Sequence, residues 1–128
     1  GRHSSEVLLL DVPRVTDVRA GDLDGDGDLD LVVALFGLFR TGGLIWLEQD
    51  PDRRFHRHDL AQRTGCSHVP LLDVDGDGDL DIAALFSQEH EQVVVYRNDG
   101  SSGFSPHVVF RGPHPMFGCS SLAPTDLD

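Results

Sequence analysis

Positive charge is scarce in this 128-residue sequence, and lysine is missing from it altogether. All ten basic residues are arginines, against 22 acidic residues, and the formal net charge at pH 7 is −12. Nucleic acids and anionic membrane surfaces bind proteins chiefly through clustered Lys and Arg. The charge balance therefore argues against both as partners.

Long apolar runs are also missing. No segment approaches the ~20 apolar residues of a membrane-spanning helix, and no signal peptide is recognisable. We therefore expect no membrane insertion. Cysteine occurs only twice, at Cys66 and Cys119, so the chain can form at most one internal disulfide.

What the sequence has in excess is aspartate at alternate positions. The motif D-x-D-G-D-G-D-L-D occurs at Asp22–Asp30 and again, 51 residues later, at Asp73–Asp81. Carboxylates crowded this closely repel one another unless a cation neutralises them. In calcium loops, positions 1, 3, 5 and 9 offer carboxylates, position 7 offers its backbone carbonyl, and a glycine at position 6 permits a sharp turn. The spacing favours two calcium loops over two solvated acidic loops.

The sequence repeat extends beyond the two motifs, because the residues around them align at the same spacing. Val15–Val18 aligns with Cys66–Val69, Leu31–Ala34 aligns with Ile82–Leu85, and a third copy begins near Gly118. We assign residues 1–14 to the end of a preceding repeat (a blade of the fold predicted below), 15–65 to repeat 1, 66–118 to repeat 2, and 119–128 to the truncated start of repeat 3. Because the third motif is incomplete and the sequence has no initiator Met, we expect a fragment of a longer array.

Turn residues divide each repeat into four candidate strands. The expected strands are 15–21, 30–35, 43–48 and 55–60 in repeat 1, and 66–72, 81–86, 92–97 and 104–111 in repeat 2, with 6–10 as the last strand of the preceding repeat. The second strand of each repeat is a continuous apolar run, which indicates burial on both faces. Asn98-Asp99-Gly100 is a strong hairpin signal. No window shows a helical period, so we expect almost no helix.

Four antiparallel strands every ~50 residues predict stacked sheets, and radial stacking of such sheets gives a β-propeller. The predicted fold class is all-β: a fragment of a β-propeller with about two four-stranded antiparallel blades plus edge strands of neighbouring blades. Such a piece leaves its two outer faces bare. We expect it to be marginal as a monomer or to associate.

The motifs and the strands that follow them resemble a known repeat. Asp22–Asp30 leads into LVVALF, Asp73–Asp81 leads into IAALF, and the later strands bring YRNDGSSGF. This pattern looks like the FG-GAP/VCBS-type repeat, which is similar to the blades of the integrin α-subunit propeller. The resemblance implies a calcium loop between the first two strands of each blade. The family's Gly-Ala-Pro segment after the second strand is not evident here, which weakens the integrin-specific version.

Direct matching to the family motif gives the metal ligands. Asp28 and Asp79 stand at position 7 and would act through their carbonyls, so their side chains should be replaceable. Asp126 and Asp128 match only the first two positions of a third loop and should not hold an ion. The implied ligands are Asp22, Asp24, Asp26, Asp28 and Asp30 in the first loop, and Asp73, Asp75, Asp77, Asp79 and Asp81 in the second. Two bound Ca²⁺ ions would bring the charge from −12 to about −8.

An EF-hand is the main rival for such a loop. It needs a bidentate Glu at position 12 and flanking helices. Position 12 is Val33 in one copy and Ala84 in the other, and both lie inside apolar strands. The sequence therefore excludes the EF-hand and its relatives.

The resemblance implies a non-enzymatic protein that is extracellular, at the cell surface or periplasmic. Its Ca²⁺ would be structural, and its partners would be a protein or glycan ligand and the remaining blades of the same protein. One alternative is a propeller enzyme, a hydrolase or lyase, with its active site in the central channel or an attached domain. Asp17, His68 and Ser121 share a register in successive first strands and have the chemistry of a nucleophilic triad, but we favour a polar channel lining. Another alternative is a spacer that binds nothing.

Several weaker candidates have plainer explanations. His56 and His58 alternate on one strand and have metal-ligand chemistry, but we favour an exposed outer strand. Trp46 and Tyr96 suit glycan stacking, but we favour a place in the core between blades. The loop 36–43 is the longer of two equivalent loops and is a place to look for binding.

The two cysteines enter equivalent first strands of adjacent repeats. A disulfide needs their Cα atoms within about 7 Å, and neighbouring blades diverge from the propeller axis. We favour buried free thiols, and the sequence leaves the bridge between Cys66 and Cys119 open.

Overall fold

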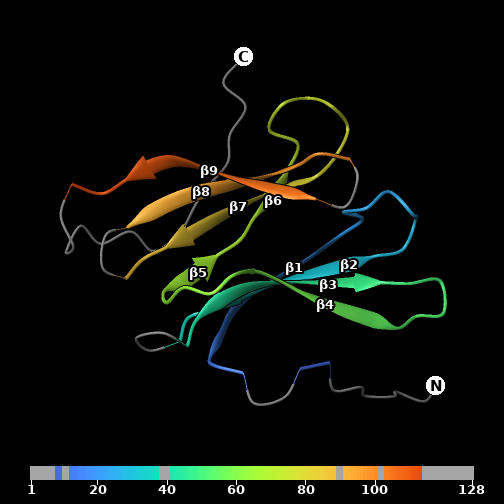
Figure 1. The fold of residues 1–128 in the computed structure, drawn as a ribbon, viewed down its shortest axis with the longest axis horizontal. Helices are drawn as coiled ribbons and strands as arrows, with labels where there is room; N and C mark the ends of the chain where they lie inside the picture. Colours follow the sequence, from blue (N-terminus) through green and yellow to red (C-terminus); the bar gives the residue numbers. More distant parts are fainter. Residues whose placement is uncertain (1–7, 10–11, 38–40, 89–90, 101–102, 114–128) are drawn as a thin grey trace.

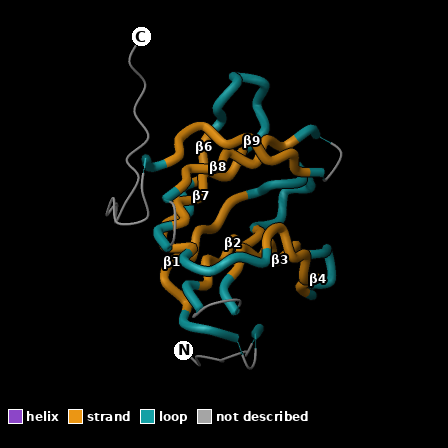
Figure 2. The backbone as a smooth tube through the Cα atoms, turned by 60° about the vertical axis from the view of Figure 1, so that its left-hand side comes forward, coloured by secondary structure: helices purple, strands orange, loops and turns teal. Residues whose placement is uncertain are grey.

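The computed structural model describes residues 8–9, 12–37, 41–88, 91–100 and 103–113, and these form two antiparallel β-sheets without any helix. The strands of the first sheet, paired in chain order, are β1 (Val15–Gly21), β2 (Asp30–Leu35), β3 (Gly43–Gln49) and β4 (Phe55–Ala61). Those of the second sheet are β5 (Cys66–His68), β6 (Leu71–Leu72), β7 (Asp81–Phe86), β8 (Gln92–Asn98) and β9 (Phe104–Arg111). Here the order is β5-β7-β8-β9, and β6 also pairs with β7. Figures 1 and 2 show the two sheets as separate stacked layers.

The second strand of each sheet is buried on both faces, as its apolar run predicts. All residues of β7 are buried, and in β2 only Leu31 is partly exposed. A strand that faces water on one side would bury every second residue. Both faces of these two strands are therefore shielded from water.

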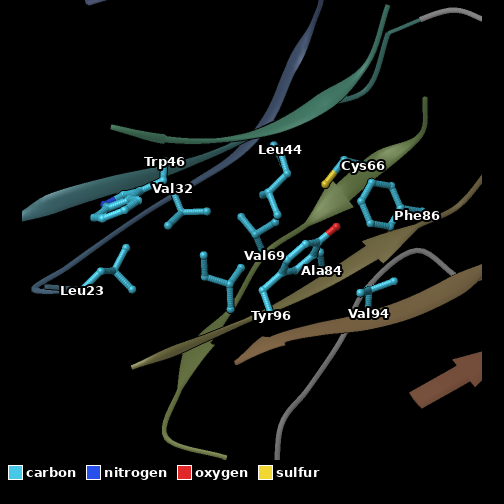
Figure 3. Packing of buried hydrophobic residues seen from close by; sticks show 12 residues of the cluster. Leu23, Val32, Leu44, Trp46, Cys66, Val69, Ala84, Phe86, Val94 and Tyr96 are labelled. Carbon is cyan, nitrogen blue, oxygen red and sulfur yellow. The ribbon is translucent and has the colours of Figure 1, made fainter. Parts of the chain in front are cut away.

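The main core lies between the two sheets. Val32, Leu44 and Trp46 of the first sheet point toward Ala84 and Tyr96 of the second (Figure 3), and Ile82 belongs to the same cluster. The Trp46 ring also packs edge-on against Phe104 of β9, with ring centroids 5.3 Å apart. Trp46 is 1% exposed and Tyr96 is 6% exposed. Both aromatics are thus core residues, and neither offers a stacking surface to a glycan.

A smaller core covers the other face of the first sheet. Val33, Leu35, Ile45 and Leu47 pack there against residues that precede β1, including Leu8 and Leu9. We predicted a strand over residues 6–10, but Leu8 and Leu9 are not in a strand. The rest of that predicted strand lies outside the described residues.

The first strands of the two sheets differ. β1 is continuous, whereas the predicted strand over 66–72 is divided into β5 and β6 by Val69 and Pro70. Proline has no backbone N–H to donate to a ladder. The Pro70 carbonyl still accepts a bond from Ala83 N at 3.0 Å, so β7 remains attached across the gap.

The remaining strands lie where the sequence predicts them, to within one residue. The all-β fold class is confirmed, and two stacked antiparallel sheets of this kind are consistent with a fragment of a β-propeller. The first sheet lies within the expected repeat 15–65, and the second sheet lies within 66–118. In the described part of the chain there is no helix long and apolar enough to cross a membrane.

Candidate metal centre in two equivalent loops

Both acidic motifs form the connection into the second strand of a sheet. The first runs from the end of β1 into β2, and the second runs from β6 into β7. Both glycines of each motif are in the left-handed region, with φ of 77° and 89° in the first loop and 75° and 91° in the second. A Cβ at any of these glycines would meet nothing within 4 Å. The glycines are therefore required by backbone conformation and not by crowding.

The first aspartate of each motif ties the loop together. Asp22 accepts hydrogen bonds from Gly25 N at 2.8 Å and from Gly27 N at 2.9 Å, one on each carboxylate oxygen. Asp73 accepts from Gly76 N and Gly78 N, both at 2.8 Å. This turn presents the loop's carboxylates on a fixed backbone frame.

The last aspartate of each motif is fully buried and anchors the loop to the sheet. Asp30 accepts from Leu23 N at 3.0 Å and from Gln49 N at 2.9 Å. Burial raises the pKa of the Asp30 carboxyl above its usual value, although these two N–H groups act against that rise. Asp81 accepts from Val74 N at 2.8 Å and from Asn98 N at 2.7 Å.

Asn98 also connects the second sheet to the first loop. Its side-chain amide donates to the Leu23 carbonyl and, at 3.1 Å, to the Leu80 carbonyl. The Asn98 side chain is buried, and it lies between the two loops. The backbone of the first loop is therefore held partly by the second repeat.

The structure brings together the same three carboxylates in each loop. Oxygen atoms of Asp22, Asp24 and Asp30 all lie within 4.8 Å of one another, and so do those of Asp73, Asp75 and Asp81. These are motif positions 1, 3 and 9. Hard cations such as Ca²⁺ take all-oxygen ligand sets, so the donor chemistry of both groups fits that ion.

The other predicted ligands lie in the same loops but outside these two groups. Asp26 Oδ1 accepts from Asp28 N at 2.8 Å, and Asp77 Oδ1 accepts from Asp79 N at 2.9 Å. Asp126 and Asp128 lie outside the described residues.

A residue outside the motif makes the two loops different. Leu31 and Ile82 are aligned positions of the two repeats, and they pair with Leu47 and Tyr96 on the third strands. The next residues on those strands, Glu48 and Arg97, are therefore equivalent. Burial, together with the side chains of Glu48 and Asp26, raises the pKa of Asp24 from 3.8 to about 7. Arg97 forms an ion pair with Asp75 Oδ2. Its hydrogen bond is the main cause that lowers the pKa of Asp75 to about 2.

Reasoning from sequence missed both Glu48 and Arg97. The signal that was available is their common place in the third strand, once the two repeats are aligned through β3 and β8. A hollow of about 250 Å³ lies beside the second loop, and its lining includes Asp75, Asp77, Arg97 and His107.

Of the triad candidates, the structure brings two near each other. His68 Nδ1 lies 3.8 Å from Asp17 Oδ2, across the boundary between the sheets. Asp17 is already engaged: it accepts from Val69 N at 2.9 Å and from Arg19 Nε at 3.1 Å. Arg19 Nη2 in turn lies 3.3 Å from His68 Nε2. Asp17 and its neighbours therefore form a polar link between the first strands of the two sheets. Ser121 lies outside the described residues.

The two strand histidines do not share a site. His56 Nε2 lies 2.8 Å from Asp50, whereas His58 Nε2 lies 3.0 Å from Glu48. His58 also stacks on the Trp46 ring, with centroids 4.6 Å apart. Among the described residues, the only groups of potential metal ligands are those of the two acidic loops.

Two further candidates are only partly described. In the loop 36–43, residues 38–40 lie outside the described part, and a hollow of about 420 Å³ is lined by its ends together with Pro13 and Arg14. Cys66 is a buried free thiol, and burial raises its pKa to about 12. At this residue the structure has the free thiol that the sequence analysis favoured, and Cys119 lies outside the described residues.

Comparison with known proteins gives one match. A model of the FG-GAP-like repeat matches residues 22–84 and, in a second overlapping match, residues 73–128. Each match begins at the first aspartate of an acidic motif. Neither the curated proteins nor the solved structures include a match to this chain.

Proposed function

The chain belongs to the FG-GAP-like repeat family, and on that premise we propose that its two acidic loops are structural calcium sites in β-propeller repeats. The observation that carries this proposal is the convergence of the same three carboxylates in both loops. Independent solvated loops would have no reason to bring positions 1, 3 and 9 together twice.

The proposed ligands divide by their surroundings. Asp30 and Asp81 are fully buried and held by backbone N–H groups, so they can bind an ion without losing side-chain freedom. Asp24 and Asp75 reach the same centre from the exposed side of the loop. The bound ion supplies positive charge that offsets the mutual repulsion of the carboxylates.

The gain in stability has a definite scale. Extracellular calcium modules have dissociation constants on the order of 10⁻⁴ to 10⁻³ M. At millimolar free Ca²⁺, which is about one to ten times such a dissociation constant, linkage contributes about 0.4–1.4 kcal/mol per site. Two sites together would add up to about 3 kcal/mol, against the roughly 5–15 kcal/mol typical of a whole domain.

The proposed setting is outside the cell, at its surface or in the periplasm, where calcium is abundant enough to fill sites of this affinity. The proposed role is a non-enzymatic scaffold for adhesion or recognition. Its partners would be further repeats of the same protein and a protein or glycan ligand bound through the loops of the full propeller.

Thermal unfolding with millimolar calcium and then with chelator tests the proposal. We expect calcium to raise the melting temperature by several degrees, and we expect joint Asp24→Ala and Asp75→Ala substitution to abolish that rise. The matched control is joint Asp28→Ala and Asp79→Ala, which removes the same charge from side chains that are not proposed ligands. A cooperative melt that is indifferent to calcium would exclude the proposed sites.

A further inference from the structure

We propose that the two loops are unequal calcium sites, because Arg97 occupies the second loop as an internal counter-cation while Glu48 adds a carboxylate to the first. This inference rests on the proposed function and extends it to two residues outside the motif. It assigns Glu48 and Arg97 the role of setting calcium affinity.

The two residues stand at the same place in the frame of each loop. Each immediately precedes the residue whose backbone N–H binds the buried aspartate: Gln49 N donates to Asp30, and Asn98 N donates to Asp81. These anchoring bonds are alike in the two loops. The loops therefore differ in the charge of the residue before the anchor, which is Glu48 in the first and Arg97 in the second.

In the second loop, both oxygens of Asp75 are engaged. Oδ1 accepts from Asp77 N at 3.2 Å, and Oδ2 is paired with the Arg97 guanidinium. The Arg97 side chain is 49% exposed, and that of Asp75 is 24% exposed. An ion that takes Asp75 as a ligand must therefore displace Arg97 or bind beside its positive charge. The hollow lined by Arg97, Ser105 and His107 gives the displaced guanidinium room to move.

In the first loop, the same place carries a negative charge. Glu48 stands at the register position that Arg97 has in the second loop, directly before Gln49, whose backbone N–H donates to the buried Asp30. The Glu48 Oε1 atom lies 3.0 Å from His58 Nε2. Here an arriving cation meets one more carboxylate, where the second loop has the Arg97 guanidinium.

The size of the effect follows from Coulomb's law. A unit charge about 4–5 Å from a divalent ion changes its affinity on the order of tenfold even in a medium as polar as water, and salt reduces this for exposed groups. The two loops differ by the opposite charges of Glu48 and Arg97. We therefore expect the first loop to fill at least tenfold earlier than the second as calcium rises.

Calorimetric titration of the full chain with calcium chloride tests this inference. The wild type should bind in two steps; Asp22→Asn should remove the tight step, and Asp73→Asn should remove the weak one. Arg97→Gln should tighten the weak step about tenfold and leave the tight step unchanged. Glu48→Gln should weaken the tight step by a similar factor and leave the weak step unchanged.

Two controls separate charge from other effects. Arg97→Lys keeps the positive charge and should keep the weak step weak. Arg111→Gln removes the same charge from the other end of the second sheet, where Arg111 pairs with Gln92, and should change neither step. Circular dichroism of each variant confirms that it is folded before titration.

The outcomes distinguish this inference from the function on which it rests. If no variant binds calcium, the proposed function and this inference both fail. If both loops bind with one affinity, and Arg97→Gln and Glu48→Gln leave it unchanged, the loops are calcium sites and only the inequality is wrong. If Arg97→Gln weakens the second step, Arg97 supports calcium binding and the inference is also overturned.

Discussion

The two acidic loops share a backbone frame but differ in the charge that faces it. In both, the first aspartate bonds two glycine N–H groups and the last is buried between two further N–H groups. Beside this common frame stands Glu48 in one repeat and Arg97 in the other. The difference teaches that the motif specifies the geometry of a loop, whereas residues of the neighbouring strand set its electrostatics.

The largest difference in stability should separate Trp46 from Val95, two equivalent positions of the third strands that lie on the same side of their own sheets but face different parts of the molecule. Trp46 faces the second sheet and is 1% exposed, whereas its counterpart Val95 is 8% exposed on the far face of the second sheet. We expect Trp46→Ala to lower the free energy of unfolding by about 4 kcal/mol and Val95→Ala to lower it by about 2 kcal/mol. Urea unfolding in one buffer measures both. Equal losses would mean that the contact between the sheets is not the main core.

Asp30 and Asp81 should contribute equally to stability, because each accepts two equivalent backbone hydrogen bonds. Asp30→Ala and Asp81→Ala each leave two backbone N–H groups without their acceptor. We expect each to cost about 2 kcal/mol in chelator, independently of any ion. Asp28→Ala, which removes a less buried carboxylate from the same loop, is the control. A large loss in one loop and none in the other would contradict the common frame.

The contribution of Asp17 to stability, through the polar link between the first strands, should be lost at acidic pH. Burial acts to raise the pKa of Asp17, but the Val69 N–H and Arg19 outweigh it, and the pKa is lowered below 3.8. The folded state therefore favours the carboxylate: this stabilisation is complete above the unfolded pKa and is lost as pH falls through the folded one. We expect Asp17→Asn to cost about 1 kcal/mol at pH 7.

Chemical unfolding of wild type and Asp17→Asn as a function of pH measures that difference. The gap between the two should shrink below about pH 4, where the wild-type carboxylate takes up its proton. Asp59→Asn, at an exposed ion pair with Arg57, should show a smaller difference throughout. A gap that widens in acid would contradict the lowered pKa.

The smallest effect concerns reactivity and leaves stability unchanged. Cys66 is fully buried, and burial raises its pKa to about 12, whereas its counterpart Val15 is 45% exposed. We expect iodoacetamide at pH 8 to leave native Cys66 unlabelled and to label Val15→Cys readily, because only the thiolate reacts. Peptide mapping by mass spectrometry assigns the labelled site. Rapid labelling of native Cys66 would show that the boundary between the sheets opens.

Most of the fold was predictable because two kinds of signal agreed. Apolar runs such as Leu31–Leu35 and the turn residues between them placed the strands to within a residue. Two strand predictions were wrong. Pro70 divides the strand 66–72, although its missing N–H is a local property visible in the sequence. Leu8 and Leu9, predicted as part of a strand over 6–10, are not in a strand. The pairing of strands into two stacked sheets followed from the period of the repeat.

The site was predictable only as far as the motif reaches. The alternation of aspartate and glycine identified the loops, but it did not show that positions 1, 3 and 9 come together while Asp26 and Asp77 do not. The roles of Glu48 and Arg97 depend on the register between β3 and β8 and their neighbours, which lies outside the motif. The contact of Asp17 with Val69 depends on how adjacent sheets pack, and strand patterns carry no information about that distance.

The bond from the Asn98 amide to the Leu23 carbonyl joins residues 75 positions apart. Such a contact forms late, because the intervening chain must first be made and folded. During synthesis, which proceeds from the N-terminus at about 5–20 residues per second, the first loop lacks this partner until the third strand of the next repeat has emerged. The first repeat is thus completed by the second, and we expect ribosome-bound chains that end before residue 98 to show faster amide exchange in the first loop than chains that extend well beyond it.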